Sequence, residues 1–468
     1  KVASAADADL VAAQRGMNPP VSVHGFTKYF TLVSIPKNGY PANMAKRFPV
    51  PDLARPSVNA GRKAVRRRST WLLLHLIQTG GPSSQAELAR RSGLSRASVC
   101  GLLQPLTRKR ILVQERKLPS RLGRKVTIFG FSPYTTLAAG VSIDQEECEV
   151  ALVDLSARVV DRASATYPRY TEPHEIVALA VSLIQALAKR NRVDSLIGAG
   201  VALPGLIDSG SGLVWAAANL GWHNVQLGAL FEQRLRVPVR VEHLGRAKAR
   251  AEATWGRGIG YRNFVCLEIG SGIGAGVMVD GQILRGAGAS AGEVGHTLFD
   301  PRGPSCACGL NGCWEVYCAS PAIRRRLGEH LVLDGGSGSA LSPAATIREL
   351  GQAAEQGDPV ALRVVAETAE LLARGLGSII WNFDPGLIIL SGPVVRDCPS
   401  LVEATRSGLG ALKAVRKFDM PLLAAAQEPD ASVIAASAIV LFRHVEELAK
   451  GDAAVSAVIP DGEALLAD

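Results

Sequence analysis

Three cysteines and one histidine lie close together in the sequence and form its clearest chemical pattern. The segment 292–296 (GEVGH) precedes Cys306, Cys308 and Cys313, with glycines between the last two cysteines. Three thiolates and one imidazole suit tetrahedral zinc, and the glycines allow the tight turns that would bring the sulfur atoms together. Because four protein ligands leave no position for water, we expect His296 and these cysteines to hold a structural zinc ion. Free thiols in a reducing compartment are the alternative.

The other cysteines do not share this spacing. Cys318 follows the cluster, and we expect it to be a bystander. Cys100, Cys148, Cys266 and Cys398 stand among apolar neighbours, which indicates that they pack as small apolar side chains. Eight cysteines in 468 residues are too few for a disulfide scaffold.

Two glycine-rich turns are candidates for holding a phosphate group. Gly270, Ser271, Gly272 and Gly274 follow one apolar run, and Gly392 follows another. Glycines at the end of a buried strand let a phosphate approach the backbone amides closely. Each turn alone is equally consistent with ordinary turn chemistry.

Charge divides the chain into two unlike parts. Residues 1–135 hold 23 Lys and Arg against five Asp and Glu, whereas the remaining 333 residues hold 29 against 37. A strongly basic N-terminal third indicates a module that binds a polyanion such as DNA, and the mildly acidic remainder cannot do so by bulk electrostatics. A solvated basic tail is the alternative.

The composition favours a soluble protein of several domains. Apolar residues make up 47% of the chain and charged residues 20%, which argues against a disordered protein. No apolar run approaches the length of a membrane span, and the N-terminus lacks the pattern of a signal peptide. We therefore expect a cytoplasmic protein that makes no membrane contact.

Residues 62–131 carry the pattern of a winged helix-turn-helix. Apolar spacing over residues 71–77 predicts a first helix, closed by Gly80-Gly81-Pro82. A capping box at Ser84–Glu87 starts a second helix, and Gly93 permits the sharp turn that follows it. Helix, glycine turn and helix is the plan of this motif.

The third helix is the expected reader of DNA. Ser95 caps it, and its exposed N-terminal end, which enters the major groove in this class, carries Arg96 and Ser98. We expect Arg96 to read bases, with Ser95 and Ser98 supporting it. Pro105 predicts an early kink in the same helix. Three basic residues before the first helix would add nonspecific attraction: Arg66, Arg67 and Arg68.

Two β-prone runs, 111–113 and 126–129, predict a hairpin after the third helix. Its basic tip holds Arg121, Arg124 and Lys125, which we expect to meet phosphates or the minor groove. A purely structural three-helix domain is the alternative. The hairpin and the charge imbalance together favour DNA binding.

Alternating strands and helices begin at about residue 137 and predict a layered α/β fold. The segment 334–343, rich in Gly and Ser, predicts a surface loop. Residues 1–61 show no sustained period, so we expect a disordered or non-native extension, with Met17 and Met44 as later starts. The apolar runs that read as buried strands are 137–143, 150–153, 196–203, 264–269 and 387–390.

From residue 62 to about 450 the chain resembles the ROK family of bacterial sugar kinases and sugar-responsive repressors. It is most similar to the winged-helix repressor branch, which includes the N-acetylglucosamine and xylose repressors. The resemblance is carried by segment 292–296, the cysteine cluster with Trp314-Glu315 after it, 218–222 (ANLGW), 270–274 and 94–99 (LSRASV).

The resemblance implies an N-terminal winged helix-turn-helix followed by a two-lobed, actin-like ATPase fold, assembled as a homodimer or homotetramer. A sugar would lie in the cleft between the lobes. Within the ROK domain, lobe one would cover about 137–255 plus the helix 432–450, and lobe two about 256–431. The expected divisions are 1–61 for the extension, 62–131 for the winged helix, 137–450 for the ROK domain and 451–468 for the tail.

The resemblance also implies the contacts to sugar hydroxyls, namely Glu293, His296 and Glu315, with Asn219 as a neighbour. The chemistry agrees, because carboxylates accept hydrogen bonds from hydroxyls, and an imidazole with one nitrogen on zinc can offer the other to a ligand. For Glu293 and Glu315, a solvated loop carboxylate is the alternative.

Two departures from the family's kinases predict that the chain has no catalytic residue. Those kinases place an Asn-Asp pair after the strand at 239–242, where this chain has His243-Leu244. Leu244 cannot accept a proton, and the loss of a general base alone slows transfer by roughly 10²- to 10⁴-fold. Asp144-Gln145-Glu146 stands in place of a Gly-Gly-Thr phosphate loop, and its carboxylates repel a triphosphate. The glycine-rich turns would then be a vestigial nucleotide loop.

These features together predict a DNA-binding transcriptional regulator whose inactive kinase-like domain senses a sugar or sugar derivative. We expect it to act as a repressor. Its partners would be a double-stranded operator, the effector and further copies of itself. A sugar kinase with an appended DNA-binding domain is one alternative. A regulator that no longer binds any ligand is the other.

Overall fold

A computed structural model of the chain describes residues 61–119, 125–132, 136–333, 338–411, 420–426, 430–451 and 457–458. All of them belong to one compact unit, Ala45–Asp468. The expected extension 1–61, except for residue 61, and most of the tail lie outside the described residues, as do Arg121 and Arg124. The backbone of Lys125 is described, but its side chain is not.

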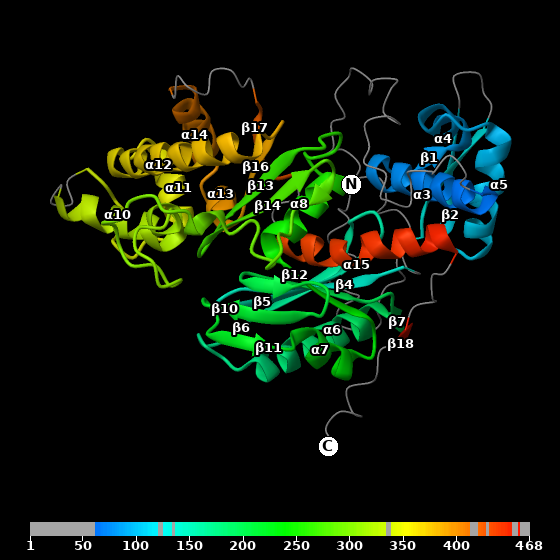
Figure 1. The fold of residues 1–468 in the computed structure, drawn as a ribbon, viewed down its shortest axis with the longest axis horizontal. Helices are drawn as coiled ribbons and strands as arrows, with labels where there is room; N and C mark the ends of the chain where they lie inside the picture. Colours follow the sequence, from blue (N-terminus) through cyan, green and yellow to red (C-terminus); the bar gives the residue numbers. More distant parts are fainter. Residues whose placement is uncertain are drawn as a thin grey trace, which may run out of the picture. The chain divides into compact units, whose positions relative to one another are not determined.

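The N-terminal part of the described chain is a winged helix, as predicted (Figure 1). The three strands form an antiparallel sheet in the order β1-β3-β2, so that the long β2–β3 hairpin is the wing. Gly93 adopts the left-handed conformation (φ 72°) between the second and third helices. The elements are α3 (Arg62–Gly80), β1 (Ser83–Ser84), α4 (Gln85–Ser92), α5 (Arg96–Arg108), β2 (Leu112–Pro119) and β3 (Lys125–Phe131).

Two details of this region differ from the expectation. Arg66, Arg67 and Arg68 lie inside α3 rather than before it, because the helix already begins at Arg62. Ser84 accepts a hydrogen bond from the Glu87 backbone amide at 3.1 Å, but the Glu87 carboxylate binds Arg90 instead of completing a capping box. Helix α5 includes Pro105 and continues to Arg108, and the kink expected at Pro105 stays a prediction.

The first of two five-stranded sheets has the strand order β12-β8-β4-β5-β6. Strands β4, β8 and β12 run parallel, while β4, β5 and β6 form an antiparallel meander. Helices α6 and α7 cover one face of this sheet (Figure 1). The elements are β4 (Ala138–Ile143), β5 (Glu147–Val153), β6 (Val159–Thr166), α6 (Pro173–Asn191), β8 (Ala199–Leu203), α7 (Leu227–Leu235) and β12 (Val239–His243).

Two small sheets accompany the first large one. One is the antiparallel set β9 (Leu206–Asp208), β10 (Leu213–Ala217) and β11 (Trp222–Val225), which follows β8 in the chain. The other pairs β7 (Ser195–Leu196) with β18 (Ala457–Val458), so that residues near the C-terminus lie beside the first sheet's domain.

The second large sheet repeats the topology of the first. Its order is β15-β14-β13-β16-β17, again with an antiparallel meander followed by two parallel strands. Its strands are β13 (Phe264–Ile269), β14 (Ile273–Val279), β15 (Gln282–Ile283), β16 (Ile388–Ser391) and β17 (Leu422–Ala424). Its helices are η3 (Val294–His296, a 3₁₀ turn), α9 (Glu315–Cys318), α10 (Ser320–Leu333), α11 (Ile347–Glu355), α12 (Pro359–Phe383), α13 (Pro393–Asp397) and α14 (Ser400–Ala411).

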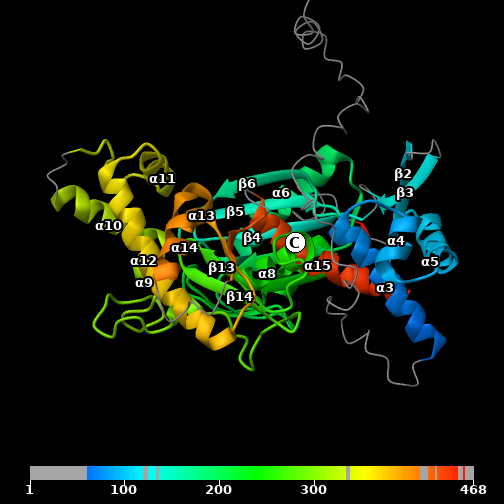
Figure 2. The ribbon, with the colours of Figure 1, turned by 90° about the horizontal axis from the view of Figure 1, so that it is seen from above.

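Two central helices lie between the large sheets. α15 (Ala431–Lys450) packs on the first sheet, α8 (Leu244–Trp255) packs on β13 and β14 of the second, and the two helices pack on each other. α15 approaches the first sheet so closely that a Cβ atom on Gly200 would collide with the backbone oxygen of Ala436. The sequence-predicted buried strands are all present, and the two repeats face each other across this pair of helices (Figure 1). Figure 2 shows that α15 extends from the sheets to α3.

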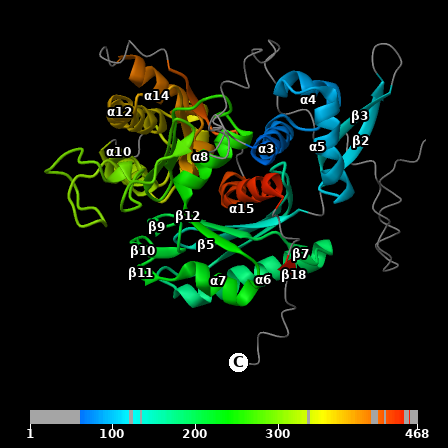
Figure 3. The ribbon, with the colours of Figure 1, turned by 45° about the vertical axis from the view of Figure 1, so that its right-hand side comes forward.

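The winged helix shares an apolar core with the first sheet and α15. Trp71 and Leu74 of α3 belong to one cluster with Ala151 of β5 and Leu441 of α15. Helix α3 contacts both α15 and α8 (Figure 3). The DNA-binding motif and the central helices are therefore packed together. Among the described helices, none combines the length and apolarity that a membrane span requires.

Candidate functional site

The four expected metal ligands come together in the structure. The ligand atoms of His296, Cys306, Cys308 and Cys313 all lie within 4.8 Å of one another. The Cys308 and Cys313 Sγ atoms are 3.6 Å apart, close to the separation of about 3.8 Å that Zn–S bonds of about 2.3 Å give in a tetrahedron. The donor set and its spacing therefore fit a tetrahedral metal ion with four protein ligands.

The backbone around the cysteines explains how this cluster forms. The Cys306 amide donates to the Leu310 carbonyl at 2.8 Å, which closes a tight loop around Cys308. Gly312 has a φ of 68°, and a Cβ atom there would collide with the carbonyl oxygen of Asp300. Cys318 is fully buried in the core of the second sheet's domain and is not part of the metal group, as expected of a bystander.

Glu315 connects the metal cluster with the glycine-rich turn after β13. Its Oε1 lies 3.0 Å from the Cys306 Sγ and 3.6 Å from the His296 Nδ1, and its Oε2 accepts from the Ile273 amide at 3.3 Å. A Cβ atom on Gly272 would lie 2.9 Å from the Glu315 carboxylate and 3.7 Å from the Asn219 amide nitrogen. Expected sugar contacts from two separate segments thus meet at one place.

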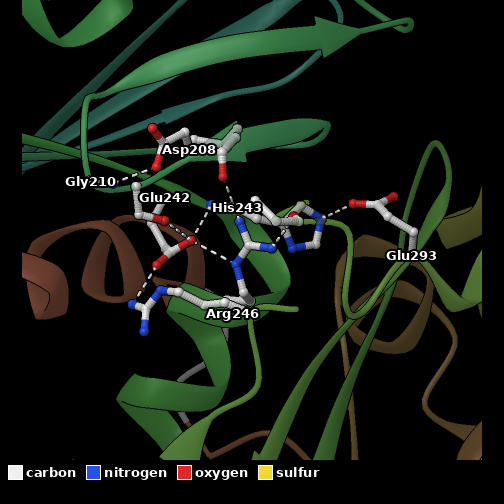
Figure 4. A network of polar contacts seen from close by, with 10 residues as sticks. Asp208, Gly210, Glu242, His243, Arg246 and Glu293 are labelled. Carbon is white, nitrogen blue, oxygen red and sulfur yellow. Dashed lines mark hydrogen bonds and ion pairs between the residues drawn. The ribbon is translucent and has the colours of Figure 1, made fainter. Parts of the chain in front are cut away.

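Glu293 faces His243 rather than another carboxylate. The His243 Nε2 lies 3.5 Å from the Glu293 Oε1 (Figure 4). Burial lowers the pKa of His243 to about 3, with the Arg246 charge adding to the effect, so the ring is neutral at pH 7. Burial raises the pKa of Glu293 to about 7. Within the described residues this Glu293 oxygen is buried and has no hydrogen-bond partner.

A buried network around Arg246 holds this region in place (Figure 4). Arg246 is 1% exposed, and its Nε donates to the Glu242 carboxylate at 2.7 Å. Its other nitrogens donate to the carbonyl oxygens of Ile207 and Ala289 at 3.1 and 2.7 Å. Burial alone would raise the pKa of Glu242, but Arg246, Ser209 and Arg285 lower it below its usual value. Arg246 therefore ties β12 and β9 to the loop that leads to Glu293.

The residues at the expected nucleotide loop also meet, but with acidic neighbours. Gly270, Ser271 and Gly272 form the turn between β13 and β14, Gly274 lies in β14, and Ser271 donates to the Asp144 carboxylate at 3.1 Å. Gly392, which follows β16, lies against Glu268 at the end of β13. The Glu268 carboxylate binds the buried Lys248 at 2.6 Å, so this lysine is already paired.

Leu244, which we expect at the position of the general base in the family's kinases, is apolar and packed. Leu244 is 8% exposed and belongs to an apolar cluster with alanines of α8 and α15. Its neighbour His243 points to Glu293 instead.

The expected DNA-reading end of α5 is exposed. Ser95 accepts from the Ser98 amide at 3.1 Å and caps the helix, and its hydroxyl also contacts the Ser98 hydroxyl at 2.9 Å. Arg96 is exposed and has no hydrogen-bond or ion-pair partner in the part of the chain that the structure describes. Val99, Leu103 and Leu106 face inward. Arg96 is thus available to a ligand outside the fold.

Sequence reasoning missed Arg246 and Lys248 as buried cations of the site. The signal was the segment 239–250 (VRVEHLGRAKAR), in which basic residues interrupt an otherwise apolar pattern. A buried arginine or lysine requires an acidic partner, and Glu242 lies four residues before Arg246.

Comparisons with known families match both parts of the chain. A family model described as ROK family matches residues 138–443, and one described as MarR family matches residues 67–118. The xylose repressor of Bacillus subtilis is 25% identical over 350 residues, covering 74% of this chain and 88% of that protein. The DNA-binding transcriptional dual regulator NagC of Escherichia coli is 28% identical over 359 residues, covering 75% and 87%.

Solved structures agree with this match. A ROK family transcriptional regulator, described as a homologue of the Escherichia coli MLC protein, superposes with a TM-score of 0.67 at 23% identity, covering 83% of this chain and 99% of that chain. A ROK family glucokinase from Streptomyces griseus, in complex with glucose and AMPPNP, gives a TM-score of 0.58 at 26% identity, covering 65% and 98%. The fold is therefore an N-terminal winged helix joined to an actin-like kinase fold.

Replacing Arg246 tests whether the buried network holds the site. Arg246→Met is expected to lower the free energy of unfolding by about 3 kcal/mol, because the buried Glu242 carboxylate loses its closest cation and keeps only Ser209 and the half-exposed Arg285. The double variant Arg246→Met/Glu242→Leu should regain most of this stability. The measurement is denaturant-induced unfolding.

The control is Arg190→Met, which breaks an exposed ion pair with Asp161 and should cost no more than about 1 kcal/mol. A cost for Arg246→Met as small as that of the control would contradict the role given to the network.

Proposed function

The chain belongs to the ROK family, and we propose that it is a DNA-binding transcriptional repressor whose kinase-like body senses a sugar or sugar derivative. The observation that carries the proposal is that one folded unit holds both the exposed Arg96 end of α5 and the site around Glu293, and that the winged helix shares a core with the first sheet and α15. The names of the similar xylose repressor and NagC regulator support it. We also propose a cytoplasmic location, because duplex DNA is the expected partner.

We propose Asn219, Glu293, His296 and Glu315 as the contacts to the sugar. The oxygens of Glu293 and Glu315 would accept hydrogen bonds from sugar hydroxyls, and the Asn219 amide can donate or accept. His243 adds a neutral imidazole beside Glu293. It stands where we expect an asparagine in the family's kinases. A ligand held by both segments would draw β14 and the β10–β11 turn together, which is the closure that a sensor needs.

A structural zinc ion is the metal that this donor set suits best. His296 and the three cysteines would hold it, and it would supply a fixed positive centre that braces the loop carrying Glu315. Four protein ligands would complete the coordination, so no substrate would bind to the metal.

We propose that the body does not transfer phosphate. Leu244 packs into an apolar cluster at the position of the general base, and Asp144 approaches the glycine-rich turn where a triphosphate would lie. The similar glucokinase binds glucose and AMPPNP, which makes a sugar kinase with an appended winged helix the second candidate. ATP-dependent phosphorylation of any sugar at about 1 s⁻¹ or faster, the low end for ordinary enzymes, would favour that candidate.

DNA contact is assigned to the winged helix. Arg96, with Ser95 and Ser98 beside it, would read base edges in the major groove, and Arg121, Arg124 and Lys125 of the wing would meet phosphates. The functional division proposed is 62–131 for the reader and 137–450 for the sensor, the latter split into the lobes stated above. A homodimer or homotetramer would present two α5 helices to a two-fold symmetric operator. Exposed apolar residues on the second domain, Leu298 and Leu310, support self-association.

The sensing proposal predicts a change in operator affinity on sugar binding. The probe is a duplex selected from a random pool, and the titrants are common aldoses and amino sugars. One of them should change the Kd for the duplex by at least tenfold, because effectors typically couple with 1–3 kcal/mol. Glu293→Gln should weaken this response and leave the sugar-free Kd unchanged, whereas the exposed control Glu355→Gln should respond as the parent does.

Thermal unfolding with the same sugars separates the remaining alternative. A sugar that binds the folded state raises the melting temperature. If no sugar raises it while the duplex still binds, the chain is a regulator without a ligand, and the sensing proposal is wrong.

Arg96 is expected to determine sequence preference. Arg96→Ala should weaken binding to the selected duplex by about 1–3 kcal/mol and change binding to unrelated duplexes little. Arg90→Ala is the matched control, because Arg90 is exposed on α4 and paired with Glu87. Equal losses on all duplexes would instead assign Arg96 to phosphate contact.

The metal proposal predicts about one zinc ion per chain after dialysis, measured by elemental mass spectrometry. Cys313→Ser should lose the metal and lower the melting temperature, because a structural site contributes to folding. Cys318→Ser is the control: this cysteine is as deeply buried but lies outside the group, so the zinc content should stay the same. A parent protein without metal, or equal loss in the control, would refute the assignment.

A further inference from the structure

A second cavity lies at the junction of the winged helix and the body, away from the metal cluster. Its volume is about 340 Å³, within the range of small-molecule sites. Trp71 of α3, Arg240 of β12, Arg250 of α8 and Phe442 of α15 all line it. It is therefore bounded by the DNA-binding domain, the first sheet and both central helices.

The charges around this cavity are unbalanced. Four arginines line it, Arg240, Arg250, Arg285 and Arg443, against two glutamates, Glu242 and Glu446. Arg285 binds Glu242 at 3.0 Å, and Arg443 binds Glu447 at 3.0 Å. Among the residues that the structure describes, the guanidinium groups of Arg240 and Arg250 have no hydrogen-bond or ion-pair partner. Two cations thus border a hollow without a protein anion bound to them.

Arg250 is fixed in place although no carboxylate binds it. Its guanidinium lies over the Phe442 ring, 4.4 Å from the ring centroid. Burial lowers the pKa of Arg250 to about 10, and the nearby Arg285 charge adds to the effect, while the Glu446 and Glu242 charges act in the opposite direction. Because no carboxylate binds this partly desolvated guanidinium directly, an anion bound in the cavity would stabilise it further.

The wall contributed by α3 is aromatic. Trp71 and His75 stack with ring centroids 4.8 Å apart, and both line the cavity. An occupant would therefore meet aromatic side chains on one side and guanidinium groups on the other.

We propose that this cavity binds a small organic phosphate. The guanidinium fork matches the oxygens of a phosphate, which can carry two negative charges and so balance Arg240 and Arg250 together. The aromatic wall would hold the organic part of the ligand. This site is distinct from the sugar site: Glu242 faces the cavity, whereas the next residue, His243, faces Glu293.

The ligand would contact elements from three parts of the fold. α3 belongs to the DNA-binding domain, β12 to the first sheet, and α8 and α15 to the central layer. Its binding free energy therefore depends on how α3 sits against the body.

Calorimetric titration of the full chain, without DNA or sugar and at constant ionic strength, tests the proposal. The probes are phenyl phosphate, inorganic phosphate and benzoate. Phenyl phosphate should bind saturably and most tightly. Inorganic phosphate should bind more weakly because it lacks the ring, and benzoate should bind more weakly because it lacks the second negative charge. Arg240→Gln and Arg250→Gln should each weaken phenyl phosphate binding by at least tenfold.

Arg250→Lys should give an intermediate loss, because it keeps the charge and lacks the fork. The matched control is Arg324→Gln, an exposed arginine on α10, which should bind as the parent does. Circular dichroism of each variant checks that it is folded. The proposal is overturned if no probe binds saturably, if Arg240→Gln and Arg250→Gln bind as the parent does, or if benzoate binds as tightly as phenyl phosphate. None of these outcomes would alter the sugar-sensing proposal, since no sugar is present.

Discussion

The buried ion pair between Glu242 and Arg246 fixes the geometry on which the site depends. A guanidinium with 1% exposure is tolerated only when its donors are satisfied, and here a carboxylate and two backbone carbonyl oxygens satisfy them. One of these oxygens belongs to Ala289, in the loop that leads to Glu293. The place of Glu293 beside His243 therefore follows from the need to keep Arg246 paired.

The junction between β12 and α8 connects the site around Glu293 with the central helices. Beyond Glu242, the backbone passes His243 at the proposed sugar site and Leu244 in the core between α8 and α15. α15 in turn packs on α3 of the winged helix. A change in the site around Glu293 can reach the DNA-binding domain through packed elements alone. This continuity is the physical basis for a sensor, and it needs no phosphoryl transfer.

Features that depend on local pattern were predicted from the sequence, and features that depend on distant contacts were not. The wing strands, the Ser95 cap, the Gly93 turn and the gathering of His296 with three cysteines all follow from short spacings. The capping-box prediction was half right: Ser84 accepts from the Glu87 amide, but the Glu87 carboxylate binds Arg90 instead of the helix start. The pairing of Arg246 with the carbonyl oxygen of Ala289, and the packing of α3 on α15, join residues far apart in the chain, so no local period indicated them.

The most direct measurement of the central claim is the affinity of the effector sugar for the free protein and for the protein saturated with its operator duplex. Coupling between two sites is reciprocal, so a sugar that releases DNA must bind the DNA complex more weakly by the same factor. The account predicts a Kd for the sugar at least about tenfold higher on the complex. Equal values would show that the cleft and the DNA-reading helix act independently, and would contradict it.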